Sequence, residues 1–246
     1  MSKYLLGFDI GSSSVKAALV EIATGKTAAH AFSPDAEMSI SSPKTGWAEQ
    51  DPESWWREAV NAAAKLQDQL LFKPGEVAAI GISYQMHGLV LVDRDRQVLR
   101  PSVIWCDSRA VETGNKAFNE LGEAFCLEHF LNSPGNFTAS KLKWIRDNEP
   151  AIYEKTDKFM LPGDFIAMKM TGEICTTYSG LSEGILWDFQ KEQLAQSLLD
   201  HYDINPGLVS EPKATFSIQG RLTEGAAMLL GLQAGIPVAY RTGDQP

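Results

Sequence analysis

The sequence has few cysteines, no long hydrophobic run and no cluster of basic residues. Its three cysteines, Cys106, Cys126 and Cys175, lie far apart and form no CxxC pair or other metal-ligand pattern, which favours a reduced protein over a disulfide framework. No window approaches the roughly 18 apolar residues of a membrane-spanning helix. The sequence has 22 basic and 31 acidic residues, which gives a net charge of −9, so we expect no nucleic-acid partner.

The composition is that of an ordinary globular protein. The 246 residues are 44% hydrophobic and 22% charged, which excludes disorder over the whole chain. The first residues, up to Asp9, are typical of a strand rather than a signal peptide, because an acidic residue soon follows a short apolar run. We therefore expect a cytoplasmic protein with no membrane partner. The sequence is compatible with a homodimer.

The beginning of the chain predicts three antiparallel strands. Apolar, β-rich runs cover Tyr4–Ile10, Val15–Ile22 and Thr27–Phe32, with small-residue turns between them. A Rossmann domain begins differently, because there a helix follows the first glycine turn. A helix is then expected from Asp51-Pro52-Glu53, since Asp51 suits the N-cap and proline suits the first helical position.

Further along, predicted strands and helices are mixed. Strands are expected over residues 77–83, 88–93 and 236–240, and helices over 110–131, 139–148, 165–170, 191–199 and 224–232. The last strand leads to Gly243-Asp244, and the sequence stops two residues later with nothing to cover it. We therefore expect residues 1–246 to be a fragment cut at a domain boundary.

A carboxylate and a turn of small residues follow the first predicted strand. Asp9 stands near the strand end, and Gly11, Ser12, Ser13 and Ser14 come directly after it. Small residues let backbone N–H groups approach phosphate oxygens, the hydroxyls add donors, and a carboxylate can hold Mg²⁺. A hairpin turn with a side-chain hydrogen bond from Asp9 explains the same residues equally well.

A second carboxylate, Asp244, follows the last apolar strand and Gly243. At a strand end in a cleft, a carboxylate can act as general base toward a sugar hydroxyl. Taken alone, however, the residue is more typical of an exposed loop aspartate.

Two loop segments carry hydrogen-bonding side chains. In Gln85-Met86-His87-Gly88 the side chains of Gln85 and His87 can form hydrogen bonds with hydroxyl groups, and Met86 offers an apolar surface beside them. A lone histidine is, however, more often structural. In the segment Trp105-Cys106-Asp107-Ser108-Arg109 the indole can stack on a sugar face while Asp107 and Arg109 order its hydroxyls. A structural Asp107–Arg109 pair under a buried Trp105 is the alternative for that segment.

Taken in order, these segments resemble the FGGY family of carbohydrate kinases. Gly7–Lys16 (GFDIGSSSVK) resembles the family's first phosphate loop, and Gly46–Trp56 (GWAEQDPESWW) is similar to its W-x-E-Q-D-P-x-x-W-W segment. Gln85–Gly88 resembles the sugar-binding loop of xylulokinases in particular, and Gly243–Gln245 resembles the segment with the catalytic aspartate. Further similar segments lie in order over residues 100–109, 137–142 and 161–173, so the resemblance covers essentially the whole chain.

The resemblance implies an α/β fold, a ribonuclease-H-like domain of the actin-like ATPase and sugar-kinase superfamily with a mixed sheet flanked by helices. Residues 1–246 would form the N-terminal, sugar-binding domain, and the C-terminal, ATP-binding domain would be absent from this chain. The activity implied is phosphorylation of a small-molecule sugar by ATP with Mg²⁺. A ketopentose is expected, with D-xylulose as the first candidate and D-xylulose 5-phosphate as the product, and the isolated fragment is expected to be nearly inactive. The alternatives are another FGGY substrate (ribulose, gluconate, glycerol or rhamnulose) and a non-catalytic actin-like module.

The resemblance also implies roles for individual residues. Asp244 would take the proton from the attacking sugar hydroxyl, and Asp9 would organise Mg²⁺ and the phosphates. Residues facing the triphosphate would be Gly11, Ser12, Ser13 and Ser14, and residues contacting the sugar would be Gln85, Met86, His87, Trp105, Asp107 and Gln245. The chain departs from residues frequent in the family at Cys106, Ser108, Gly163 and Gln245, which bears on the identity of the sugar rather than on the class of enzyme.

Overall fold

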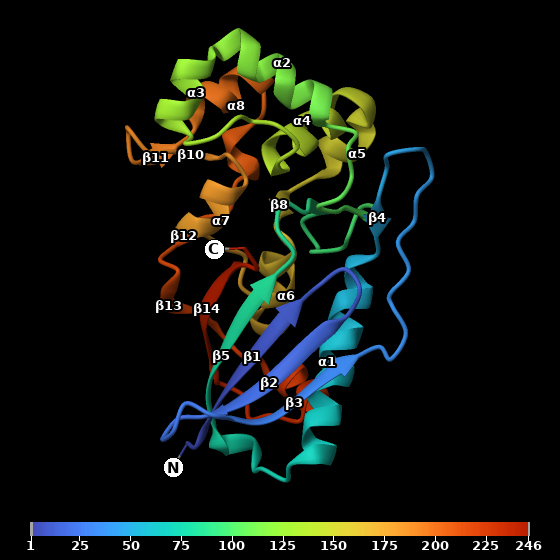
Figure 1. The fold of residues 1–246 in the computed structure, drawn as a ribbon, viewed down its shortest axis with the longest axis vertical. Helices are drawn as coiled ribbons and strands as arrows, with labels where there is room; N and C mark the ends of the chain where they lie inside the picture. The colour runs from blue at the N-terminus through green and yellow to red at the C-terminus, as the bar shows by residue number, and fades with distance from the viewer. Residues whose placement is uncertain (1, 246) are drawn as a thin grey trace.

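The computed structural model describes residues 2–245, with a central sheet and a helical lobe above it (Figure 1). The sheet has six strands in the order β13-β14-β5-β1-β2-β3. Their bounds are β1 (Tyr4–Ile10), β2 (Val15–Glu21), β3 (Thr27–Ser33), β5 (Val77–Tyr84), β13 (Phe216–Arg221) and β14 (Pro237–Gly243). Strand β1 runs antiparallel to β2 and parallel to β5, and β5 runs parallel to β14, so the sheet is mixed.

The three predicted antiparallel strands at the start of the chain are confirmed. Alternate side chains of β1, namely Leu6, Phe8 and Ile10, are buried against the core, as the alternating pattern of a half-covered strand requires. Strand β2 pairs with both β1 and β3 in antiparallel register, which places Lys16 directly opposite Asp9.

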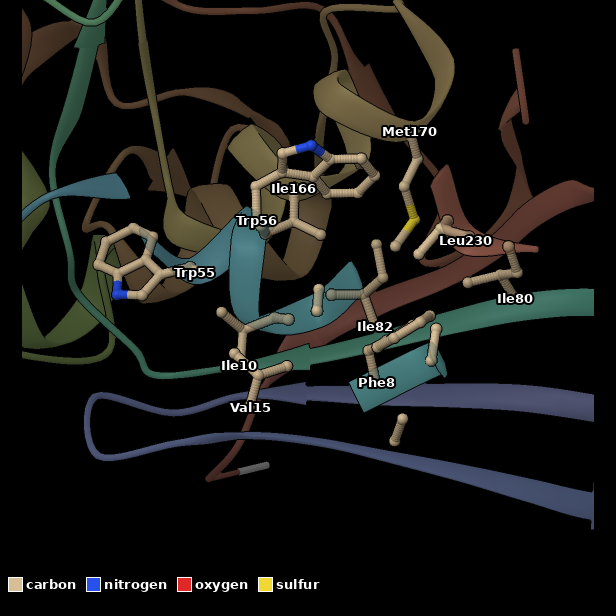
Figure 2. Close-up of a cluster of buried hydrophobic side chains, with 14 of the residues drawn as sticks. Phe8, Ile10, Val15, Trp55, Trp56, Ile80, Ile82, Ile166, Met170 and Leu230 are labelled. Atoms are coloured by element: carbon tan, nitrogen blue, oxygen red, sulfur yellow. The ribbon is translucent and has the colours of Figure 1, made fainter. Parts of the chain in front are cut away.

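Three helices cover one face of this sheet. They are α1 (Pro52–Gln69), α6 (Pro162–Thr171) and α9 (Glu224–Leu230), which lie behind the sheet in Figure 1. The core between helices and sheet is apolar, as Figure 2 shows for Phe8, Ile10, Val15, Trp55, Trp56, Ile80, Ile82, Ile166, Met170 and Leu230. Helix α1 begins as predicted, because the Asp51 side chain accepts a hydrogen bond from the Glu53 N–H and Pro52 occupies the first turn.

A second hydrophobic core holds the helical lobe, which is inserted between β5 and β13. Its helices are α2 (Val111–Leu121), α3 (Glu123–His129), α4 (Thr138–Asn148), α5 (Pro150–Lys155), α7 (Tyr178–Glu183) and α8 (Gln196–Tyr202). Short strand pairs join distant segments: β4 (Glu49–Gln50) with β7 (Ser102–Val103), β6 (Val90–Val92) with β8 (Lys158–Met160), β9 (Thr176–Thr177) with β12 (Pro212–Lys213), and β10 (Trp187–Asp188) with β11 (Gln193–Leu194). Two 3₁₀ turns cover Pro74–Glu76 and Pro206–Leu208.

Several predicted elements differ from the structure. The single helix expected over 110–131 is two helices, because Gly122 adopts φ +93° and breaks the chain direction between α2 and α3. The helix expected over 191–199 starts only at Gln196, since the preceding residues pair as β11. The strand expected over 88–93 is limited to β6, which pairs with β8 outside the central sheet.

Helix α6 is longer than the helix expected over 165–170. It starts three residues earlier, because Pro162 already occupies the first helical position. Within residues 2–245, no helix combines the length and the hydrophobicity that crossing a membrane requires.

Candidate active site

The two predicted catalytic carboxylates lie at one edge of the central sheet. Strands β1, β5 and β14 are parallel neighbours, and Tyr84 of β5 is paired with Ile10 on one side and with Gly243 on the other. Asp9 and Asp244 therefore flank the carboxyl end of β5, two strand spacings or about 10 Å apart along the hydrogen-bonding direction. Carboxyl ends of parallel strands are where ligands bind in open α/β sheets.

Charges at this edge influence each other. The Lys16 ammonium lies 2.9 Å from Asp9 Oδ2 and reaches it from the opposing strand β2. Partial desolvation raises the pKa of Asp244, the negative charge of Asp9 raises it further, and Lys16 and backbone amides oppose both effects. A strand-end carboxylate with a raised pKa and a carboxylate neighbour is the arrangement expected of a general base beside a charged ligand site.

The turn after β1 is held in place by side chains from other segments. The Gly11 N–H donates to Ser14 O, and a Cβ on Gly11 would lie 2.9 Å from that oxygen, so the turn is tight enough to favour glycine. The Gln50 amide donates to Ser12 O at 2.6 Å, and the Trp105 indole donates to Ser12 Oγ at 3.2 Å. The turn that includes Ser13, which is exposed, and Ser14 is thereby fixed beside Trp105.

The segment after β5 enters the site between the two carboxylates. The Gln85 N–H donates to Ile10 O of β1, and the Asp244 N–H donates to Tyr84 O, so all three strand ends are tied together. The Gln85 side chain is 3% exposed, and neither atom of its amide has a hydrogen-bond partner within residues 2–245. Such an orphaned amide is the sort of group that a polar ligand or an ordered water satisfies.

His87 adopts the left-handed conformation, with φ +61°. Its ring packs edge-on against Phe137, with ring centroids 4.4 Å apart, and its Nδ1 is buried without a partner within the described residues. Burial and the nearby Lys141 ammonium lower the pKa of His87 to about 4. The imidazole is therefore neutral near pH 7, with one nitrogen to donate and one to accept hydrogen bonds.

Glu183 is a site residue that sequence reasoning missed. Its carboxylate, at the end of α7, accepts from the Tyr84 hydroxyl at 3.0 Å and from the His87 N–H at 3.1 Å. Burial raises the pKa of Glu183 to about 8, and Asp164 and Asp244 raise it as well. No motif surrounds it in the sequence, so only the fold could reveal its place.

Close packing explains why the residue before Asp244, Gly243, is a glycine. A Cβ at this position would overlap the Met86 side chain and lie 2.9 Å from Glu183 Oε2. Met86, Glu183 and the end of β14 therefore pack so closely that a larger residue at Gly243 displaces at least one of them.

Lys141 was also missed as a functional candidate. Its ammonium is almost completely buried on α4 and donates to His87 O at 2.8 Å and to Ile104 O at 3.0 Å. Burial lowers the pKa of Lys141 to about 8, against the opposing influence of Asp107. This side chain joins the His87 segment to the segment that carries Trp105.

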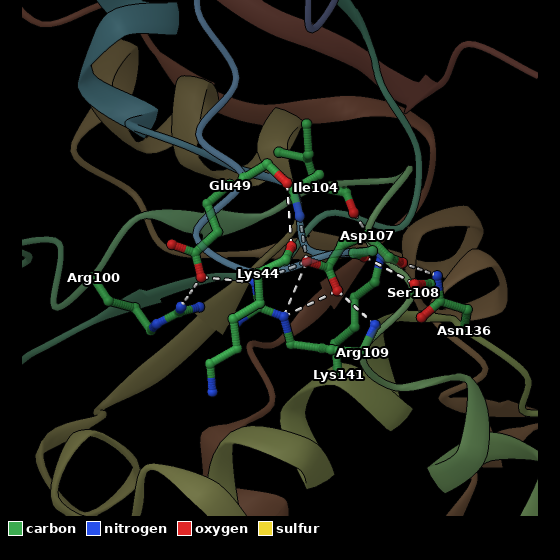
Figure 3. A network of polar contacts seen from close by, with 12 residues as sticks. Lys44, Glu49, Arg100, Ile104, Asp107, Ser108, Arg109, Asn136 and Lys141 are labelled. Atoms are coloured by element: carbon green, nitrogen blue, oxygen red, sulfur yellow. Dashed lines mark hydrogen bonds and ion pairs between the residues drawn. The ribbon is translucent and has the colours of Figure 1, made fainter.

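The structure separates the residues of the Trp105–Arg109 segment. Asp107 is fully buried and accepts from the Ala48 N–H at 2.6 Å and from the Arg109 guanidinium (Figure 3). Arg109 also pairs with Glu49 and lies 3.8 Å from the ring centroid of Trp47. The geometry thus favours the structural pair for Asp107, and the indole that covers this pair is Trp47.

Trp105 and Gln245 both lie at the surface. The Trp105 side chain is 53% exposed while its nitrogen reaches Ser12, and Gln245 is exposed directly after Asp244. Within residues 2–245, no group of three or more His, Cys, Asp or Glu side chains is placed to hold a metal ion. The structure therefore brings together several of the predicted site residues, namely Asp9, Asp244, Gln85, Met86, His87 and the Gly11–Ser14 turn with Trp105. The Asp107 side chain is instead buried in its contacts with Ala48 and Arg109.

Comparisons with known proteins find several that are named as kinases of xylulose or glycerol. Xylulose kinase of Escherichia coli strain K12 is 32% identical over 240 residues, which are 97% of this chain and 48% of that protein. Glycerol kinase of Thermococcus gammatolerans is 29% identical over 249 residues, 100% of this chain and 49% of that protein. The crystal structure of xylulose kinase from Rhodospirillum rubrum matches with a TM-score of 0.88 at 30% identity, covering 98% of this chain and 49% of that chain.

The likeness to sugar kinases confirms the predicted α/β fold, with a mixed sheet flanked by helices as in actin-like ATPases. The chain spans about half the length of the curated relatives it matches. Residues 4–246 match the FGGY family of carbohydrate kinases, N-terminal domain. The chain therefore belongs to the FGGY family of carbohydrate kinases.

Proposed function

We propose that residues 1–246 are the sugar-binding domain of a kinase that transfers phosphate from ATP to a ketopentose, with D-xylulose as the first candidate. The observation that carries this proposal is the placement of Asp9 and Asp244 at one sheet edge, on either side of the segment that leads to His87. The likeness to proteins named xylulose kinase supports the choice of sugar.

Asp244 is the proposed general base. Its place at the end of β14, beside Met86, lets it accept the proton of the sugar hydroxyl that attacks the γ-phosphate. Phosphoryl transfer depends mainly on positioning and on neutralising charge, so one well-placed base and a phosphate site supply most of what the protein must provide.

Asp9 is the proposed magnesium ligand. Its side chain is 34% exposed at the strand end and its partner Lys16 is itself exposed, so the carboxylate is accessible to an ion. Magnesium usually binds one or two carboxylates together with substrate phosphates and water, and this donor set suits such a shared site. The ion would neutralise phosphate charge, while Gly11, Ser12, Ser13 and Ser14 would offer amide and hydroxyl donors to the triphosphate.

The sugar is proposed to lie against Met86, with the unpartnered groups of Gln85 and His87 meeting its hydroxyls. Trp105 would cover it from the side of the serine turn, and Gln245 would approach from beside the base. Asp107 would act on this pocket through Arg109 and the Ala48 backbone, since its own oxygens are occupied.

The test is a panel of sugars assayed with ATP and Mg²⁺ on the intact protein. We expect D-xylulose to give the highest kcat/KM. Preference for ribulose, gluconate, glycerol or rhamnulose would contradict the choice of sugar but keep the class of enzyme.

The variant Asp244→Asn tests the proposed role of Asp244 as general base. We expect kcat to fall by roughly 10²- to 10⁴-fold, the range of a lost general base, with a small change in KM for the sugar. Asp95→Asn, an exposed loop aspartate, is the control and should keep full activity. A protein whose function is indifferent to Asp244→Asn would be a non-catalytic module instead.

A further inference from the structure

His87 has a backbone conformation that needs external support. It is not a glycine, yet its φ of +61° lies in the left-handed region, which is unfavourable for residues with a side chain. The residue follows the end of β5, and its ring direction is set by this backbone and by the edge-on contact with Phe137. Such conformations persist where the surroundings determine them, and they concentrate at functional sites.

Two buried polar side chains hold the two sides of this residue. The Glu183 carboxylate accepts the His87 N–H at 3.1 Å, and the Lys141 ammonium donates to His87 O at 2.8 Å. Both side chains are buried, and they come from helices α7 and α4 rather than from the segment itself. The bond from Lys141 has a charged donor, and such bonds are stronger than those between neutral groups. Glu183 accepts as a buried carboxyl group, and losing this acceptor would leave the His87 N–H unpaired at a cost in free energy. The pair is therefore well suited to fix a strained backbone.

Each of these two side chains is also hydrogen-bonded to a second part of the site. Glu183 accepts from the Tyr84 hydroxyl at the end of β5, and Lys141 donates to Ile104 O, next to Trp105. The two side chains thus connect the His87 segment with the end of β5 on one side and with the Trp105 segment on the other.

We propose that Glu183 and Lys141 form a clamp on the His87 backbone and act as positioning residues for the sugar. The clamp directs the unpartnered Nδ1 of His87 and holds the His87 and Trp105 segments at a fixed separation. Its effect on the sugar rests on the proposed function, whereas its effect on the His87 backbone does not.

Gly163 is part of the same arrangement. A Cβ at this position would overlap the ring of Tyr84, so the first turn of α6 leaves room for that ring. Because the Tyr84 hydroxyl is hydrogen-bonded to Glu183, the absence of a side chain at Gly163 permits the contact that orients the carboxylate. Burying a carboxyl group and an ammonium group is costly, and apolar residues would fill the space without that cost, which accords with a positioning role.

The first arm of the test measures hydrogen exchange of the His87 amide in the intact protein. Glu183→Ala should make this amide exchange at least tenfold faster. Glu183→Gln keeps an acceptor for the amide and should stay within about threefold of the wild type. Unchanged exchange in Glu183→Ala would overturn the clamp.

The second arm measures sugar kinetics in the intact protein. Lys141→Met and Glu183→Ala should raise KM for the sugar at least tenfold and leave KM for ATP within about threefold, with Glu183→Gln restoring the sugar value. Lys143→Met, on the same helix but only partly buried and paired with Asp147, is the control and should change neither. An unchanged sugar KM in Lys141→Met would overturn the positioning role, even if Glu183→Ala fails to fold.

The two arms separate the clamp from the proposed function. If the wild-type protein phosphorylates no sugar, the proposed function fails and the positioning of a sugar fails with it. The exchange measurement still decides whether Glu183 holds the His87 backbone.

Discussion

The ionisation of Glu183 links a single side chain of the proposed sugar site to the stability of the protein. Tyr84, Asp164 and Asp244 surround it, and burial raises its pKa from 4.5 to about 8. Between these values the folded protein keeps the proton that the unfolded chain has released. The free energy of unfolding that Glu183 contributes is therefore complete below about pH 4.5 and is lost as the pH rises to about 8.

We expect the free energy of unfolding to fall by about 1–2 kcal/mol between pH 6.5 and pH 8 because of this residue, since one proton per molecule corresponds to about 1.4 kcal/mol per pH unit. Urea unfolding of the wild type and of Glu183→Gln over this range is the measurement, and the variant should lack the decrease. His87 acts in the opposite direction only below about pH 6.5, because its pKa is lowered from 6.5 to about 4. Parallel curves for the two proteins would contradict the raised pKa of Glu183.

Gly243→Ala tests the close packing next to the base. The added methyl overlaps Met86 and approaches Glu183, so we expect KM for the sugar to rise at least tenfold as Met86 moves. Steady-state kinetics of the intact protein provide the readout. Gly225→Ala is the matched control, because a Cβ there meets nothing within 4 Å and the residue lies on α9 away from the site. Equal kinetics in both variants would show that Met86 is not essential for sugar binding.

Residues differ in how far their place could be predicted from the sequence. Asp9, Asp244 and His87 stand in segments that resemble a known family, so their grouping was predictable before any coordinates. Glu183 and Lys141 act on His87 from helices 96 and 54 positions along the chain. Their role depends on burial and on contacts between distant segments, which no local pattern encodes.

Among the elements, helix α1 offers a direct test of how local sequence supports the fold. Its N-cap, Asp51, accepts the Glu53 N–H at 3.1 Å. The helix packs on β2 and β3, and its Trp55 and Trp56 belong to the hydrophobic core between helices and sheet. Asp51→Ala should lower the free energy of unfolding by about 1 kcal/mol, the usual value of an N-cap. Asp51→Asn keeps an acceptor and should lose little. Urea unfolding decides, and equal losses in both variants would rule out a capping contribution.

Elements with a strong local pattern were predicted well. Strands β1, β2, β3 and β5 were expected within two residues of their ends, because each alternates buried and exposed positions between clear turns. The break at Gly122 and the pairing of β6 with β8 were not expected. The break requires a positive φ at Gly122 within an otherwise helical pattern, and the pairing of β6 with β8 joins segments about 70 residues apart. Neither feature follows from the local sequence pattern.

For the whole molecule, the proposal of a second domain leads to a prediction about residues 1–246 alone. This chain has a hydrophobic core beneath its sheet and another within the helical lobe, so we expect it to fold on its own. With D-xylulose and ATP it should show less than about one hundredth of the turnover of the intact protein, because most of the ATP site would be missing. Full turnover by the isolated chain would contradict the proposed division of the protein.

The backbone pairing of β1, β5 and β14 has a consequence for how such a protein changes its substrate. Hydrogen bonds between main chains hold Asp9 and Asp244 on either side of β5, so substitutions of side chains leave the separation of these strand ends almost unaltered. The neighbouring loops carry the groups proposed to meet the sugar, and they lie outside this ladder. If the proposed roles hold, the choice of sugar can change through the loops while the separation of the proposed base from the proposed phosphate site stays constant.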